Sequence, residues 1–324
     1  MTPSPSSAPR ISVVMCTYNG ERFLREQMDS ILAQDLAPYE VIVQDDQSAD
    51  ATWSILEEYH AAHPDVVKIF RNPERLGFNA NFRTVLQRAA GDFVAISDQD
   101  DVWFPQKLRR QAATIGTADC CVSQYYTDPE YRLPLRQLVT PKLQFEHLLF
   151  YDCTPGHTML LRRDFVQNLP AWDDRFFYDW WLSLHAFIGR GIVCTPEPLN
   201  WHRHYAGSAT TFVARKGLFR QPEHPTWQPY VVGLYRRYRL QRRETWQKFY
   251  TYLAAHIDPA VHPTPSAIAR LQTRRNPFAL LRLSILCARH YREVYPGQPR
   301  GIKGRLRAFF YPLLSAYFGQ GFFK

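Results

Sequence analysis

The amino-acid sequence predicts an α/β protein built on a doubly wound, mostly parallel sheet flanked by helices, with a helical C-terminal extension. Through residue 115, short apolar runs rich in β-branched residues alternate with segments of helical periodicity, which is the pattern of parallel strands joined by helices. From about residue 228 the chain reads as successive helices dense in Arg, Tyr and Phe. We therefore expect a disordered tail at 1–10, an α/β domain at 11–225 and a helical extension at 226–324.

The first half of the chain contains four expected strand–helix units. The run ISVVMC (11–16) predicts a buried strand, and ERFLREQMDSILAQ (21–34) predicts the helix after it. The other elements are expected in the order EVIVQ (40–44), ATWSILEEYHAAH (51–63), VVKIF (66–70), LGFNANFRTVLQRAAG (76–91), DFVAIS (92–97) and FPQKLRRQAATIG (104–116). Asp50 or Ser48 is expected to cap the second helix.

After residue 116 the alternation weakens. Strands are expected at CCVSQYY (120–126), HTMLLRR (157–163) and IVCTP (192–196), and helices at RDFVQNLP (163–170) and FFYDWWLSLHAFIGRG (176–191). The Pro-rich segment 127–144 reads as a loop. Asn276–Pro277 reads as a helix start, because a capping residue precedes a first-turn proline.

Composition indicates the class of partner and the compartment. The formal charge of +9 favours an anionic partner such as a nucleotide, a nucleic acid or an acidic lipid. The six cysteines form no CxxC pair, so we expect a reduced cytoplasmic protein. The segment MTPSPSSAPR lacks the apolar core of a signal peptide, and no apolar run is long enough to span a bilayer.

Polar clusters follow three of the expected parallel strands, at Thr17–Asn19, Asp45–Asp46 and Asp98–Asp101. Ligands of doubly wound sheets bind beyond the carboxyl ends of the strands, so we expect these clusters to face one cleft. Asp45 and Asp46 would accept hydrogen bonds from a base or a ribose, and an ordinary Asx turn is the alternative. The first cluster would offer the same nucleotide a hydroxyl, an aromatic face and an amide, from Thr17, Tyr18 and Asn19, or would merely cap a helix.

The stretch SDQDDVW (97–103) carries the strongest signal. Asp98, Asp100 and Asp101 lie within four positions directly after a strand, and like charges this close need a compensating cation. Carboxylates suit Mg²⁺ or Mn²⁺, which would neutralise a bound diphosphate. The alternative is a solvated acidic turn in which Asp98 caps the next helix.

A candidate general base lies further along the chain. Asp179 stands beside Trp180 and Trp181, whose rings would desolvate the carboxylate, raise its pKa and stack on a sugar. The alternative is a carboxylate that is favoured at the N-terminus of a helix by the helix dipole.

Two more short segments are candidates for ligand contact. Arg203 would bind a phosphate, and either His204 or the less favoured His202 would be a metal ligand or a proton donor, although a lone histidine is usually structural. Gly156–His157 would allow close backbone approach to a sugar.

The C-terminal helices combine basic and aromatic residues, and no acidic residue follows Glu293. They would dock on an anionic membrane surface, or else pack on the α/β domain or on a partner subunit. RRYRLQRR (236–243) suggests phosphate contacts, but Arg-rich helices are often simply solvated.

With these residues identified, the chain resembles the family 2 glycosyltransferases of GT-A fold. The blocks ISVVMCTYNGERFL, EVIVQDDQSADAT, LGFNANF and DFVAISDQDDVW match that family in order and spacing, and the resemblance covers roughly residues 10–210. SDQDDVW and YDWWLSLHAFIGRGIVCTPEPLNWHRH are similar to bacterial rhamnosyltransferases and related polysaccharide-assembly enzymes. The resemblance implies inverting transfer from a nucleoside-diphosphate sugar, dTDP-rhamnose or a UDP-sugar, to a surface glycan or a lipid-linked glycan. It also implies a cytoplasmic location, with peripheral attachment to the inner membrane face.

The resemblance also implies roles for individual residues. They are base binding by Asp45 with Asp46 beside it, donor binding by Asn79, metal binding by Asp98 and Asp100 with Asp101 adjacent and by His204, and proton abstraction by Asp179. Two positions depart from the family pattern. Tyr178 replaces the usual Glu or His before the base, and Gln47 stands where the second block usually has Gly.

Two other functions compete with this interpretation. A nucleotidyltransferase that makes the activated sugar also uses a doubly wound sheet and Mg²⁺, but TYNGERFLRE lacks its Gly-rich, basic loop. A non-catalytic, membrane-attached scaffold would not need the acidic residues Asp98, Asp100 and Asp179. Nucleic-acid binding is not expected, because no recognised motif accompanies the positive charge.

Overall fold

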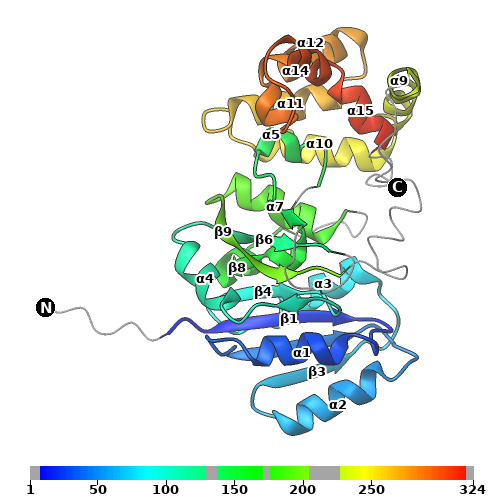
Figure 1. Ribbon diagram of the computed structural model, residues 1–324. Coiled ribbons are helices and arrows are strands. Elements are labelled where there is room, and N and C mark those ends of the chain that lie inside the picture. Colours follow the sequence, from blue (N-terminus) through cyan, green and yellow to red (C-terminus); the bar gives the residue numbers. More distant parts are fainter. Residues whose placement is uncertain (1–7, 129–136, 153, 171–175, 204–226, 319–324) are drawn as a thin grey trace, which may run out of the picture. The chain divides into compact units, whose positions relative to one another are not determined.

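The structure is a computed structural model that describes residues 8–128, 137–152, 154–170, 176–203 and 227–318 (Figure 1). The chain forms two compact units. Unit 1 comprises Met1–Pro141, Thr154–Asp174 and Gly189–His204, and unit 2 comprises Lys142–Cys153, Arg175–Ile188 and Tyr205–Lys324. Two segments from the middle of the chain therefore join the C-terminal helices, and the expected boundary at residue 225 lies outside the described residues.

Unit 1 is built on a sheet whose described strands follow the order β3-β2-β1-β4-β8-β6-β9-β5, with β7 paired to β6 (Figure 1). The strands are β1 (Ile11–Thr17), β2 (Glu40–Asp45), β3 (Val67–Arg71), β4 (Phe93–Ser97), β5 (Val102–Trp103), β6 (Cys120–Tyr126), β7 (Leu138–Val139), β8 (Leu160–Arg162) and β9 (Ile192–Trp201). β1 runs parallel to β2 and β4, β2 to β3, and β6 to β9, whereas β8 is antiparallel to both of its neighbours. The predicted doubly wound, mostly parallel sheet is confirmed.

Helices cover both faces of this sheet. They are α1 (Leu24–Leu32), α2 (Thr52–Ala62), α3 (Phe78–Leu86), α4 (Lys107–Thr114) and α6 (Arg163–Gln167), with the 3₁₀ turn η1 (Gly156–Thr158). Val13 and Met15 of β1 lie in one buried cluster with apolar residues of α1, α2 and α4. Val14 points to the opposite face, because successive strand residues alternate, and α3 packs there on β1 and β2.

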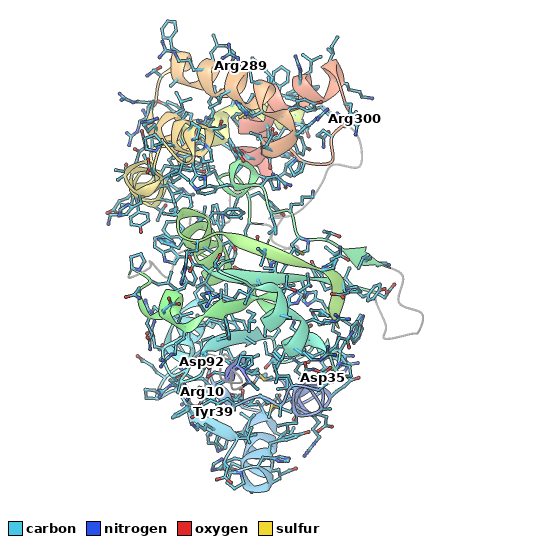
Figure 2. All side chains as sticks on the ribbon, turned by 90° about the vertical axis from the view of Figure 1, so that its left-hand side faces the viewer. Arg10, Asp35, Tyr39, Asp92, Arg289 and Arg300 are labelled. Atoms are coloured by element: carbon cyan, nitrogen blue, oxygen red, sulfur yellow. The ribbon has the colours of Figure 1, made fainter. Side chains whose placement is uncertain are left out.

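The amino ends of the central strands are closed by structural contacts. Arg10 forms an ion pair with Asp92 at 3.1 Å, and its guanidinium lies 5.0 Å from the ring centroid of Tyr39 (Figure 2). Buried Glu40 accepts hydrogen bonds from the Ser12 hydroxyl and the Lys68 ammonium, each at 2.6 Å. The polar groups of this edge are therefore engaged in holding the strands together.

Unit 2 is helical in its described residues. Its helices are α5 (Phe145–Leu148), α7 (Tyr178–Ile188), α9 (Gln228–Leu240), α10 (Glu244–His256), α11 (Pro263–Thr273), α12 (Pro277–Arg289), α13 (Tyr291–Val294), α14 (Ile302–Phe309) and α15 (Tyr311–Phe318). Asn276 caps α12 through its side-chain oxygen, which accepts a hydrogen bond from the Ala279 amide at 2.8 Å, as the sequence predicts. Within the described residues, no helix is both long enough and apolar enough to cross a membrane.

The basic segment RRYRLQRR is not uniformly solvated. Arg237 is buried, donates a hydrogen bond to Gln272 Oε1 at 2.7 Å and lies 5.7 Å from the Trp246 ring centroid. Burial lowers the pKa of Arg237 to about 10. This arginine therefore stabilises the helix packing rather than facing a phosphate.

Candidate active site

The carboxyl ends of β1 and β2 are joined by hydrogen bonds around Asp45. Thr17 lies opposite Asp45 in the parallel register, and its hydroxyl donates to Asp45 Oδ1 at 3.0 Å. The Ser48 amide donates to Asp45 Oδ2 at 3.0 Å, and Arg71 Nε lies 3.4 Å from the same oxygen. Asp45 is fully buried, so its visible role is to order this edge, and contact with a base stays a prediction.

Asp46 fixes the loop that precedes α3. Its carboxylate accepts hydrogen bonds from the amides of Leu76 and Gly77 at 2.7 and 2.8 Å, and from Asn72 Nδ2 at 2.8 Å. Asn72 Nδ2 also donates to buried Asn81 Oδ1 at 3.0 Å. Sequence reasoning missed this buried amide network.

The side chain of Asn79, the donor-binding candidate of the same block, is half-buried in the first turn of α3. The structure therefore places Asn79 beside the loop that Asp46 orders, and its contact with a donor stays a prediction.

Gln99, the third residue of SDQDDVW, connects the acidic loop to the loop after β1. Its Oε1 accepts a hydrogen bond from the Tyr18 amide at 2.9 Å, and its Nε2 donates to the Tyr18 carbonyl at 3.2 Å. A Cβ at Gly20 would lie 2.3 Å from Gln99 Oε1, so a larger residue there would displace the Gln99 side chain. The neighbouring Asn19, at φ 49°, accepts a hydrogen bond from the Ala49 amide at 2.9 Å. The three predicted clusters therefore lie together at one edge of the sheet.

Asp98 and Asp100 are half-buried at the tip of β4. Arg203 Nε donates to the Asp100 carbonyl at 2.8 Å, and the guanidinium lies 4.1 Å from the Phe23 ring centroid and 4.4 Å from that of Trp201. The same guanidinium forms an ion pair with Glu26. Arg203 therefore holds the acidic loop in place, and its predicted phosphate contact is not shown.

Behind this loop, Asp101 lies between two histidines. Its Oδ1 is 3.0 Å from His202 Nδ1, its Oδ2 is 3.4 Å from His157 Nδ1, and all three residues are buried. The two imidazole rings are stacked, with centroids 4.4 Å apart. Among the described residues, these three form a cluster whose ligand atoms lie within 4.8 Å of one another. We call Asp101, His157 and His202 the Asp–His–His cluster.

The electrostatics of this cluster are those of a buried ion pair. Burial alone would raise the pKa of Asp101, but the two histidines outweigh it and lower that pKa to about 2. Burial alone would lower the pKa of His202, but the Asp101 carboxylate outweighs it and raises that pKa to about 9. A carboxylate with two imidazoles also fits a divalent transition-metal ion, whereas Asp98 and Asp100 offer the oxygen ligands that Mg²⁺ prefers.

A buried lysine, Lys107, forms hydrogen bonds to residues of the Asp–His–His cluster and its surroundings. Lys107 Nζ donates to the His157 carbonyl at 2.7 Å and to Asn200 Oδ1 at 3.3 Å, and Asn200 Nδ2 lies 3.3 Å from Asp101 Oδ2. Burial lowers the pKa of Lys107 to about 7. Sequence reasoning missed this residue, although a lysine is unfavourable in the first turn of a helix and therefore signals a specific contact.

Asp179, Trp180 and Trp181 belong to unit 2, where they form the start of α7. Asp179 Oδ1 accepts a hydrogen bond from the Trp180 amide at 3.0 Å. Both tryptophans are buried, Trp180 against Phe249 and Trp181 against Tyr252, with ring centroids 4.8 and 5.2 Å apart. The rings thus form part of the core of this unit, a packing that does not favour the predicted sugar stacking.

The remaining predicted site residues are Gly156, His157 and the histidines that flank Arg203. The structure places Gly156 and His157 in η1, with His157 in the Asp–His–His cluster rather than on an open surface. His204 lies outside the described residues, so its metal role stays a prediction. His202, which the sequence analysis ranked below His204, lies beside Asp101 in this cluster.

Comparison with protein families decides the class of this domain. Residues 12–169 match the model of glycosyl transferase family 2. The chain carries a family 2 glycosyltransferase domain. An uncharacterized protein of Mycobacterium tuberculosis is 30% identical to the chain over 210 residues, which cover 60% of the chain and 59% of the relative. The dTDP-rhamnosyl transferase RfbG of Shigella flexneri is 28% identical over 189 residues, 53% of the chain and 64% of RfbG. The chain thus spans about three fifths of the length of these curated relatives.

Solved structures show the same fold as the glycosyltransferase domain. Residues 1–349 of TarS from S. aureus, in complex with UDP-GlcNAc, superpose with a TM-score of 0.54 at 17% identity, covering 88% of this chain and 81% of TarS. The mannosyltransferase PcManGT of Pyrobaculum calidifontis, in complex with GDP-Man and Mn²⁺, gives a TM-score of 0.50 at 17% identity, covering 99% of this chain and 88% of PcManGT. The predicted GT-A-like fold is confirmed.

Proposed function

We propose that this protein transfers a sugar, with inversion at the anomeric carbon, from a nucleoside-diphosphate donor to a hydroxyl of a bacterial surface glycan. The observation that carries the proposal is the edge of unit 1 at which Thr17, Gln99 and Arg203 tie three loops around the acidic tip of β4. This edge belongs to a family 2 domain, and donors of doubly wound folds bind at the carboxyl ends of the strands.

Different residues of this edge would bind the nucleotide and the diphosphate of the donor. The loop after β1 and the backbone ordered by Asp45 and Asp46 form the nucleotide side of the site. Asp98 and Asp100 form the diphosphate side and would hold a Mn²⁺ or Mg²⁺ ion, for which His204 or the Asp–His–His cluster would supply further ligands. When bound, that ion supplies positive charge that stabilises the departing nucleoside diphosphate.

Asp179 supplies the general base of the reaction. Its carboxylate takes the proton from the acceptor hydroxyl as that oxygen attacks the anomeric carbon from the face opposite the nucleotide. The bond from the anomeric carbon to the diphosphate oxygen breaks, and the nucleoside diphosphate leaves. The likeness to RfbG supports dTDP-rhamnose as the first donor, and a UDP-sugar is the second. The acceptor is a glycan or lipid-linked glycan at the inner face of the cytoplasmic membrane.

Product analysis tests this function against its competitors. Purified protein is incubated with Mn²⁺ and either dTDP-rhamnose or UDP-glucose, with water or simple glycosides as acceptors, and the released nucleotide is separated by chromatography. We expect release of nucleoside diphosphate, abolished by a chelator. Release of pyrophosphate when sugar phosphate and nucleoside triphosphate are supplied would identify a nucleotidyltransferase instead, and binding without turnover of either donor would support a scaffold.

A further inference from the structure

We propose that unit 2 docks on an anionic lipid surface through a face formed by α12 and α14. We call this the α12–α14 face. Its apolar residues are exposed, and they are Phe278, Leu281, Ile285, Ile302, Leu306 and Phe310. The two helices pack against each other. This inference goes beyond the proposed transfer reaction and does not depend on it.

On α12 the apolar residues occupy two opposite sides. Ala279, Leu283 and Cys287 are buried and hold the helix on its unit. Phe278, Leu281 and Ile285 recur at helical spacing on the other side, and the Phe278 side chain is 77% exposed. A helix with apolar residues on two sides has more apolar surface than its own unit buries.

On α14 the buried and the exposed sides differ more clearly in residue size. The inner side consists of the small residues Gly304 and Ala308, and a Cβ at Gly304 would lie 2.1 Å from the Pro299 carbonyl oxygen. The outer side carries Ile302 and Leu306, which are 78% and 57% exposed, followed by Phe310 one turn further. Large apolar residues at i and i+4 therefore point away from the packing surface, whereas the Phe310 ring also contacts Tyr230, with ring centroids 5.1 Å apart.

Unneutralised positive charge surrounds these apolar residues. Over residues 277–318 the sequence has seven Lys or Arg and a single acidic residue, Glu293. In the described part of the chain, no carboxylate forms an ion pair with the exposed basic residues Arg282, Arg289, Arg300, Lys303 and Arg305. Figure 2 shows Arg289 and Arg300 at the surface of this helical layer. Apolar residues flanked by Arg and Lys match the acyl boundary and the charged headgroups of an anionic bilayer, so this chemistry selects lipid as the occupant.

A second exposed stripe lies on α9, and it is the internal comparison. It carries Val231, Tyr235 and Tyr238. There Arg242 lies 4.3 Å from the Tyr238 ring centroid and Arg239 lies 5.9 Å from that of Tyr235, so the arginines are engaged with the stripe itself. Arg282, Arg289, Arg300, Lys303 and Arg305 have no such aromatic partner among the described residues.

Vesicle flotation with the full chain tests the proposal. Vesicles of phosphatidylcholine alone are compared with vesicles that contain about one third phosphatidylglycerol, at low and high salt. We expect binding to the anionic vesicles, at least about tenfold weaker binding to the neutral ones, and loss of binding at high salt. Each basic residue near such a surface contributes about fivefold to binding, so Lys303→Glu with Arg305→Glu should weaken it by at least about 25-fold.

Matched variants separate this face from the rest of unit 2. Ile302→Ser with Leu306→Ser should weaken binding by at least about tenfold, because the apolar insertion is lost. Val261→Ser removes an equally exposed apolar side chain elsewhere in the unit and should leave binding within about twofold of wild type. All variants should keep the wild-type melting temperature, because none of these side chains is buried.

Three results would overturn the proposal. They are equal binding to neutral and anionic vesicles, α12–α14 variants that bind like wild type, and loss of binding only in a Val231→Ser, Tyr238→Ser variant of α9. Sedimentation of the same proteins adds one more outcome. If Ile302→Ser with Leu306→Ser dissolves a dimer and leaves vesicle binding unchanged, the face is a contact between two copies of this chain. Vesicle binding is measured without donor or acceptor, so it can fail while the proposed transfer activity stands.

Discussion

Replacing Asp179 by asparagine should lower kcat for sugar transfer by about a thousandfold while leaving donor affinity unchanged. Loss of a positioned general base typically costs between about 10² and 10⁴ in rate. Asparagine keeps the hydrogen bond from the Trp180 amide, because its side-chain oxygen still accepts, but it cannot take the acceptor proton. Steady-state kinetics with a fixed donor, combined with calorimetric donor titration, measure both quantities.

Glu244→Gln is the matched control for this prediction. Glu244 is also a carboxylate in the first turn of its helix, α10, and it is exposed. If both variants change only the melting temperature, by similar small amounts, and transfer persists at near wild-type rate in Asp179→Asn, then Asp179 is only a dipole-stabilising carboxylate. The base assignment would then be wrong.

Replacing Asp101 by asparagine should lower the free energy of unfolding by about 3–5 kcal/mol. The substitution removes the carboxylate and leaves the charge of buried His202 uncompensated. The two carboxylate oxygens of Asp101 face His202 and His157. The Asn200 side chain and the Arg203 amide also lie beside these oxygens. Urea denaturation of metal-free protein measures the loss. Asp92→Asn, which breaks the half-exposed pair with Arg10, should cost no more than about 1 kcal/mol. Equal losses in the two variants would show that Asp101 does not anchor the site.

The same pair predicts how the stability of the metal-free protein depends on pH. The pKa of His202 is raised from 6.5 to about 9, so its contribution is complete below pH 6.5 and is lost as the pH rises through 9. The pKa of Asp101 is lowered from 3.8 to about 2, so its contribution is present above pH 3.8 and is lost as the pH falls through 2. Unfolding free energy should therefore fall by about 2–3 kcal/mol between pH 6.5 and 9. This decline should be absent from Asp101→Asn.

The sequence predicted the N-terminal part of unit 1 because each of its strands carries its own local signal. β1, β2 and β4 are continuous apolar runs, and the alternation of strands and helices implies a parallel sheet whose carboxyl edge holds the polar clusters. The cap at Asn276 is equally local, and its side chain accepts a backbone hydrogen bond. The predicted cap of α2 at Asp50 or Ser48 is wrong, because Ala51 occupies the N-cap position, although Asp50 accepts a hydrogen bond from the Thr52 amide. Local patterns therefore sufficed for the elements and for the edge where the candidate site lies.

The remaining features depend on contacts between distant residues, which no local pattern encodes. Asp101 meets His157 and His202 only because η1 and the end of β9 come to the tip of β4, whereas the family resemblance indicated His204. From the sequence, Lys107 is one more residue of a basic helix. Only the fold shows that it contacts Asn200 and the His157 carbonyl. Likewise, Trp180 and Trp181 read as a sugar platform until their burial against α10 is seen.

Calorimetric titration with a nucleoside diphosphate tests most directly whether the acidic tip of β4 binds a metal-bridged nucleotide. The titrations use dTDP and UDP, with Mn²⁺ or with a chelator, on wild type and on the Asp98→Asn, Asp100→Asn double variant. We predict that Mn²⁺ strengthens nucleotide binding by wild type at least about tenfold, and that the double variant loses this dependence on the ion. Nucleotide affinity that is the same with chelator and with Mn²⁺, or that survives unchanged in the double variant, would contradict the account.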